Sequence, residues 1–181
     1  MNDYKNKLMQ LLKENEVIKF GDFTLSSGKK SNYYVDMKKA ITEPEILSCV
    51  AHMITDEIKD SDIDKIAGPA LGAVPIATAT SLISGKPMLM IRKEKKSYGT
   101  SKQIEGELNC DDNVIIVEDV TTTGGSLLKA IDVIEDNGGK IVEAYVIVDR
   151  QEGAVDTFNE RGIIFKPLIK IDEFKAFLDE N

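Results

Sequence analysis

The chain has 181 residues, of which 42% are hydrophobic and 30% are charged. This length and composition predict one folded domain with a continuous core and exclude a largely disordered chain. The formal net charge of −8 argues against general nucleic-acid binding, which needs a basic surface. Any binding site for an anion must therefore be built from a local group of cations.

The chain shows no sign of a membrane segment. No apolar run reaches the roughly 18 to 20 residues that a spanning helix needs, and residues 1–16 lack the apolar core of a secretory signal. Cys49 and Cys110 form neither a metal-ligand cluster nor a disulfide framework. Free thiols suit a reducing compartment, so we expect a cytoplasmic protein that binds no membrane.

The N-terminal third predicts two helices around a hairpin. Leucines at helical spacing indicate a short amphipathic helix over residues 4–12, and a looser alternation indicates a hairpin over 17–36. A second helix is expected from Thr42, because Pro44 suits a first helical turn. We expect residues 1–40 to form a small hood and residues 41–181 to form the core.

The rest of the chain alternates short apolar runs with helical patterns. The expected strands cover residues 63–67, 88–91, 114–117, 144–148 and 163–169, and the expected helices cover 74–83, 127–134 and 172–178. Continuous apolar strands between helices are typical of a mostly parallel sheet with helices on both faces. In such α/β folds, ligands bind beyond the carboxyl ends of the strands.

Residues 114–126 carry the most specific pattern. An apolar strand leads into two carboxylates, then a Thr/Gly loop, then a helix. Backbone amides at a helix N-terminus suit a phosphate, and hydroxyls add donors. Adjacent carboxylates suit vicinal hydroxyls and repel phosphate, so the ligand indicated is a ribose 5-phosphate. The candidate residues are Glu118, Asp119, Val120, Thr121, Thr122, Thr123, Gly124, Gly125 and Ser126.

This segment resembles the phosphoribosyl-pyrophosphate (PRPP) signature of type I phosphoribosyltransferases. Four other segments resemble parts of orotate phosphoribosyltransferases: the substrate loop (23–31), the pyrophosphate loop (68–75), the mobile catalytic loop (92–96) and the DRQEG segment (149–153). The resemblance implies the type I phosphoribosyltransferase fold. It also implies conversion of orotate and PRPP to orotidine 5′-monophosphate and pyrophosphate, in de novo UMP synthesis.

The same resemblance implies roles for the basic run at 92–96, which carries four cations and one acid. The residues expected to be catalytic are Arg92, Lys93, Lys96 and Asp119. The three cations would hold the pyrophosphate, and Lys96 would act on the transition state. Tyr98, where many relatives carry a histidine, would contact PRPP. In many relatives this loop reaches into the neighbouring subunit, so we expect a homodimer that shares the 92–103 loop.

For the base, Arg150 offers a bidentate fork for the carboxylate or a carbonyl edge of orotate. The resemblance adds Ser27, Lys29 and Thr122 to the expected orotate site. Neighbouring side chains of a strand point to opposite faces, so at most one of the adjacent tyrosines 33 and 34 is expected to contact ligand. Mg²⁺ is implied by the pyrophosphate, and PRPP, pyrophosphate and water would hold it, with no cluster of protein ligands.

Two alternatives stay open at this point. A purine phosphoribosyltransferase would share the fold, but an uncharged purine needs neither Arg150 nor the loop at 26–30. A regulator on the same fold would sense PRPP without turnover, but the intact cationic run at 92–96 favours catalysis. Taken alone, Arg150 also fits a surface ion pair with Asp149 or Glu152.

Overall fold

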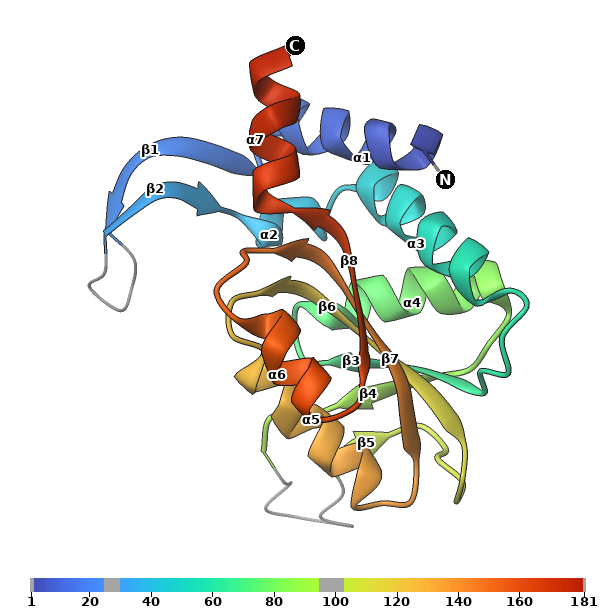
Figure 1. The fold of residues 1–181 in the computed structure, drawn as a ribbon. Coiled ribbons are helices and arrows are strands. Elements are labelled where there is room, and N and C mark those ends of the chain that lie inside the picture. The colour runs from blue at the N-terminus through green and yellow to red at the C-terminus, as the bar shows by residue number, and fades with distance from the viewer. Residues whose placement is uncertain (1, 25–29, 95–102, 181) are drawn as a thin grey trace.

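The computed structural model describes residues 2–24, 30–94 and 103–180, and it contains two sheets (Figure 1). Strands β1 (Ile18–Thr24) and β2 (Lys30–Val35) pair antiparallel as a separate hairpin. The large sheet has the order β5-β4-β3-β6-β7-β8. Its strands are β3 (Lys65–Pro69), β4 (Met88–Ile91), β5 (Ile104–Glu105), β6 (Asn113–Thr121), β7 (Lys140–Asp149) and β8 (Ile164–Lys170). All of them run parallel except β5.

Helices cover both faces of the large sheet (Figure 1). They are α1 (Asn2–Glu14), α2 (Met37–Ala40), α3 (Pro44–Ile58), α4 (Ala73–Ser84), α5 (Gly125–Glu135), α6 (Ala154–Glu160) and α7 (Ile171–Glu180). One face packs against α1, α3, α4 and α7, and the other packs against α5 and α6. None of the described helices is both long enough and apolar enough to cross a bilayer.

The central strand β6 explains why the sequence shows an unbroken apolar run. Ile115 and Val117 belong to the core beneath α3 and α4, whereas Val114 and Ile116 belong to the core beneath α5. All four side chains are fully buried, because alternate residues of a strand face opposite helical layers. The predicted α/β architecture is therefore confirmed.

Several boundaries differ from prediction. Strand β6 continues to Thr121, so the acidic pair lies on the strand and not on the loop after it. The two-residue strand β5 and the short helices α2 and α6 were not predicted, because elements this short show no periodicity. Residues on either side of position 40, such as Leu8 and Ile54, share one buried cluster, and the division there stays a prediction.

Candidate active site

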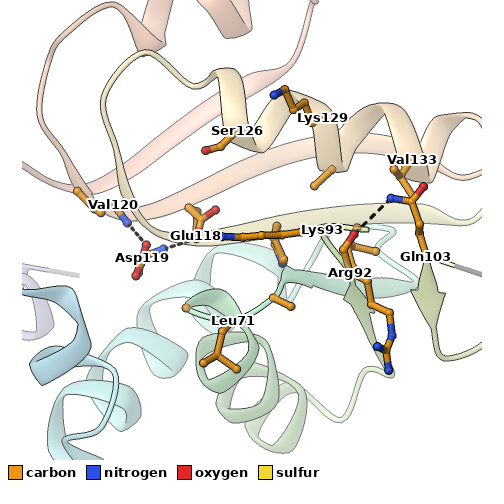
Figure 2. Close-up of a pocket in the computed structure, with 15 residues that line it drawn as sticks. Leu71, Arg92, Lys93, Gln103, Glu118, Asp119, Val120, Ser126, Lys129 and Val133 are labelled. Carbon is orange, nitrogen blue, oxygen red and sulfur yellow. Dashed lines mark hydrogen bonds between the residues drawn. The ribbon is translucent and has the colours of Figure 1, made fainter. Parts of the chain in front are cut away.

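A cavity of about 520 Å³ lies at the carboxyl ends of β3, β4 and β6 (Figure 2). This is the edge at which a parallel sheet is expected to bind ligand. The cavity is lined by Pro69, Ala70, Leu71, Gly72, Ile91, Arg92, Lys93, Gln103, Glu118, Asp119, Val120, Ser126, Lys129, Ala130 and Val133. It therefore brings together the acidic pair, the first two residues of the basic run and the pyrophosphate loop.

The two carboxylates lie side by side at the end of β6. Oε1 of Glu118 accepts the Asp119 backbone N–H at 3.2 Å, and Oδ1 of Asp119 accepts the Val120 N–H at 2.7 Å. Burial, and after it the charge of Asp119, raises the pKa of Glu118 to about 8. Glu118 therefore ionises less readily than an exposed glutamate, because the two carboxylates oppose each other's charge.

Two cations follow β4 and point in different directions. The Lys93 side chain points toward the acidic pair (Figure 2), and its charge opposes the rise in the pKa of Glu118. The Arg92 guanidinium instead turns to Glu105 on β5, with 2.8 Å between Nε and Oε1. That ion pair is partly exposed, so it contributes at most about 1 kcal/mol and is easily exchanged.

Arg92 also forms one end of a backbone link at the base of the 92–103 segment. Its N–H donates to the Gln103 carbonyl at 2.8 Å, and the Gln103 side-chain amide donates back to the Arg92 carbonyl at 3.4 Å. Both residues line the cavity. The two ends of the expected catalytic loop, Arg92 and Gln103, therefore both lie at the cavity.

The loop after β3 packs directly against the acidic pair. A Cβ added at Gly72 would lie 2.5 Å from Oδ2 of Asp119, so no larger residue fits there without moving the carboxylate. The Ala70 N–H donates to the Ile91 carbonyl at 2.7 Å, which ties this loop to the end of β4. The sequence-predicted pyrophosphate loop is thus placed between the acidic pair and the basic run.

The Thr/Gly loop between β6 and α5 leaves donors available for an anion. Helix α5 begins at Gly125 without a side-chain cap. Its first backbone N–H groups have no hydrogen-bond acceptor within the helix. Gly124 has φ +84°, and a Cβ there would lie 2.9 Å from the Phe158 ring. Thr122, Thr123 and Ser126 are exposed, whereas Thr121 is buried.

Arg150 lies beside this loop and not in the cavity lining. Its N–H donates to the Thr121 carbonyl at 3.0 Å. Its Nε contacts the Tyr33 hydroxyl and Glu152 Oε1, each at 3.0 Å. The alternative ion pair with Glu152 therefore forms, but the guanidinium is mostly buried and not a surface group. Tyr33 is buried and Tyr34 is exposed, as expected for neighbours on a strand.

The preceding residue, Asp149, is fully buried at the end of β7. Its Oδ1 accepts the Gln151 N–H at 2.9 Å, and its Oδ2 is buried with no hydrogen-bond partner among the described residues. Burial raises the pKa of this carboxyl group. This hydrogen bond holds Gln151, the residue after Arg150, next to the end of β7.

Comparison with known proteins agrees with the family that the sequence motifs resemble. A family model for the phosphoribosyl transferase domain matches residues 37–172. An orotate phosphoribosyltransferase from Methanosphaera stadtmanae is 78% identical over 178 residues, which cover 98% of this chain and 100% of that protein. The chain belongs to the orotate phosphoribosyltransferase family.

Solved members of the orotate phosphoribosyltransferase family have the same fold. The Aeropyrum pernix enzyme superposes with a TM-score of 0.82 at 32% identity, covering 96% of this chain and 99% of that one. The Mycobacterium tuberculosis enzyme in complex with PRPP gives a TM-score of 0.79 at 28% identity, covering 95% and 99%. Because the chain belongs to this family, the two alternatives from the sequence, a purine phosphoribosyltransferase and a regulator that senses PRPP, are rejected.

Some of the site residues predicted for this orotate phosphoribosyltransferase lie in the described structure and others do not. Ser27, Lys29, Lys96 and Tyr98 lie outside the described residues, so their placement stays a prediction. Sequence reasoning missed Lys129, which lines the cavity from α5. Its position three residues after Ser126 puts both on one helix face, and this spacing was the available signal.

Proposed function

We propose that the cavity between β3, β4 and β6 is the active site in which this family member makes orotidine 5′-monophosphate from orotate and PRPP. The observation that carries the proposal is the acidic pair at the end of β6, next to the uncapped start of α5. Carboxylates and free amides at these two places match the hydroxyls and the phosphate of one ribose 5-phosphate.

In this arrangement Glu118 and Asp119 accept the ribose hydroxyls. The amides and hydroxyls of the Thr/Gly loop, residues 121–126, hold the 5′-phosphate, with Val120 beneath the sugar. The α5 dipole favours the phosphate charge. Both groups belong to one strand-loop-helix unit, so PRPP binds to a single continuous segment of the chain.

The pyrophosphate lies between the loop at 68–75 and the cations. Lys93 already points into the cavity, and Arg92 reaches the pyrophosphate by leaving Glu105. From the resemblance, Lys96 and Tyr98 join them there. As the bond from C1 to the pyrophosphate oxygen breaks, its electron pair leaves with pyrophosphate. Orotate N1 bonds to the same carbon and its proton passes to solvent, while the cations stabilise the departing charge.

Orotate is itself an anion, and Arg150 is placed to bind its carboxylate. Both contacts recorded for the Arg150 head group use Nε, so the edge formed by the two terminal nitrogens is the one offered to a ligand. A planar pair of N–H donors suits a carboxylate. Thr122, Ser27 and Lys29 complete the proposed base site from the resemblance.

Mg²⁺ fits beside the acidic pair. The raised pKa of Glu118 shows that burial and the neighbouring carboxylate both disfavour a second negative charge there, and a divalent cation would offset this. PRPP oxygens and water would be the main ligands of the ion, and Glu118 and Asp119 would contact the ribose hydroxyls directly or through metal-bound water. When bound, the ion would neutralise charge on the pyrophosphate.

We also propose a homodimer that shares the 92–103 loop. Apolar side chains are exposed on α4 and on the adjacent strand β4, with Leu82 at 80% and Met90 at 40% exposure. Thr78 on α4 contacts the Met88 sulfur at 3.4 Å, which shows that this helix lies against β4. A second copy covering this face would remove these apolar side chains from water.

The first test follows the loss of orotate absorbance with PRPP and Mg²⁺ present. We expect turnover with orotate, none with adenine, guanine, xanthine or uracil, and pyrophosphate release only when orotate is added. Turnover of a purine alone, or release of pyrophosphate without a base, would contradict the proposal.

Two variants then test the roles within the cavity. We expect K96A to lower kcat at least about tenfold, which corresponds to about 1.4 kcal/mol of barrier. D119N should mainly weaken PRPP binding, which calorimetry measures. The matched control is K7A, an exposed lysine on α1, which should match the parent protein. An unchanged kcat for K96A would remove Lys96 from the mechanism.

A further inference from the structure

The head group of Arg150 is held from one side by a tyrosine of the hairpin. Nε of Arg150 donates to the Tyr33 hydroxyl at 3.0 Å, and the guanidinium carbon lies 4.8 Å from the centre of the Tyr33 ring. Glu152 Oε1 lies 3.0 Å from the same Nε. The single N–H of Nε is therefore engaged.

The other edge of Arg150 carries the two terminal nitrogens. These nitrogens donate no hydrogen bond to any residue within 2–24, 30–94 and 103–180. The side chain is 13% exposed, so the guanidinium has little freedom to rotate into solvent. The contacts at Nε therefore set the direction in which the free edge points.

Tyr33 is itself held firmly enough to act as a support. It is 8% exposed and belongs to the main buried cluster. Its backbone carbonyl accepts the Ser31 hydroxyl at 2.6 Å, and its ring lies 6.1 Å from Phe20 and 5.5 Å from Nζ of Lys175 on α7. Strand β2, helix α7 and the turn after β7 therefore meet at this ring.

We propose that Tyr33 is a positioning residue that directs Arg150 toward the orotate carboxylate. This rests on the proposed function, because it takes Arg150 as the orotate ligand. Tyr33 then acts through Arg150 without contacting the substrate. Because the guanidinium fork recognises a carboxylate, the contact contributes to the preference for orotate over bases that lack one.

The test compares Y33F, which keeps the ring and removes the hydroxyl, with R150M and the double variant. Loss of one hydrogen bond of about 1 kcal/mol predicts that Y33F raises the KM for orotate about three- to tenfold. We expect kcat and the PRPP dissociation constant to change less than about twofold. In the R150M background, Y33F should add no more than about twofold, because the group that it positions is gone.

Uracil, which lacks the carboxylate, provides a readout that general damage would not reproduce. We expect Y33F to weaken orotate binding while leaving the inhibition constant of uracil unchanged, so the ratio of the two affinities falls. A variant that is merely unstable would weaken both ligands alike. The matched control is Y4F on α1, whose ring stacks on His52 and which should behave as the parent protein.

Three results would overturn the inference: an unchanged orotate KM in Y33F, equal loss of orotate and uracil, or full additivity of Y33F and R150M. If R150M itself leaves the orotate KM unchanged, the proposed base site fails together with the inference. If R150M weakens orotate but Y33F does not, only the role of Tyr33 fails.

Discussion

Glu118 and Asp119 show how a strand can hold two carboxylates that disfavour each other. Each carboxylate accepts a backbone N–H of the next residue, which fixes both side chains near the strand. Burial and proximity raise the pKa of Glu118 to about 8, so its ionisation is disfavoured in the ligand-free protein. A cationic partner beside the pair would favour the ionised form of Glu118.

This pKa predicts a stability difference that depends on pH. The folded pKa of Glu118 lies above its ordinary value of 4.5, so the stability gained from its proton is complete below pH 4.5 and lost as pH rises through about 8. Glutamine cannot ionise. From pH 5 to pH 9, the unfolding free energy of E118Q should therefore rise relative to the parent by up to about 4 kcal/mol.

Urea unfolding at several pH values measures this difference. The control is E107Q, an exposed carboxylate on a loop, for which we expect a constant difference from the parent. The same constant difference for E118Q would show that burial does not perturb Glu118.

At the scale of elements, the start of α5 depends on a glycine. Gly124 adopts φ +84°, and a Cβ added there would lie 2.9 Å from the Phe158 ring. Gly85 adopts φ +72°, but a Cβ added there would have no neighbour within 4 Å. Both positions require a left-handed backbone, but only Gly124 also carries a close packing contact with α6. The Thr/Gly loop is therefore packed against the core through the contact between Gly124 and Phe158.

A matched pair of variants separates these two costs. We expect G85A to lose about 1 kcal/mol of unfolding free energy through its backbone alone. G124A should lose about 1 to 3 kcal/mol more, because the added methyl must displace the Phe158 ring. It should also weaken PRPP binding, whereas G85A should not. Equal losses in the two variants would show that the Phe158 contact carries no cost.

The sequence predicted the parts of this fold whose patterns are set by burial. The buried strands β3, β4, β6 and β7 appear as apolar runs because helices cover both of their faces. The apolar run at 114–117 ends before Glu118, so the strand was predicted to end there. It continues to Thr121 because the β6 backbone still pairs with β7 up to Asp149.

Contacts between distant segments could not be predicted in this way. The contact of Tyr33 with Arg150 joins residues 117 positions apart, and the contact of Arg92 with Glu105 depends on a two-residue strand. Neither leaves a periodic signal in the sequence. Residues 118–126 were predicted from the chemistry of a strand, an acidic pair and a Thr/Gly loop, and most other site residues from their resemblance to family motifs. Their hydrogen-bond partners came only from the fold.

At the scale of the whole molecule, the cavity collects segments from three strands, and the proposed dimer adds a loop from a second subunit. If that loop acts across the interface, a K96A subunit has an intact sugar site and a D119N subunit has an intact loop. A mixed dimer then contains one complete site out of two. This follows from the two-fold symmetry of a homodimer.

Mixing the two variants tests the exchange of loops. After equal amounts are unfolded and refolded together, we expect about a quarter of the parent activity at limiting PRPP, because half of the dimers are mixed. Each variant refolded alone should stay well below this value. Activity no higher than the mean of the two variants would show that each loop serves its own subunit.

The ion pair between Arg92 and Glu105 has a consequence for how the resting enzyme treats anions. The guanidinium is paired with Glu105, so a diphosphate bound by Arg92, as proposed above, would have to displace that carboxylate. A singly charged anion gains little from this exchange, whereas the multiply charged diphosphate of PRPP gains much more. Because the exposed pair contributes at most about 1 kcal/mol, its loss would be offset by even a modest gain from the diphosphate.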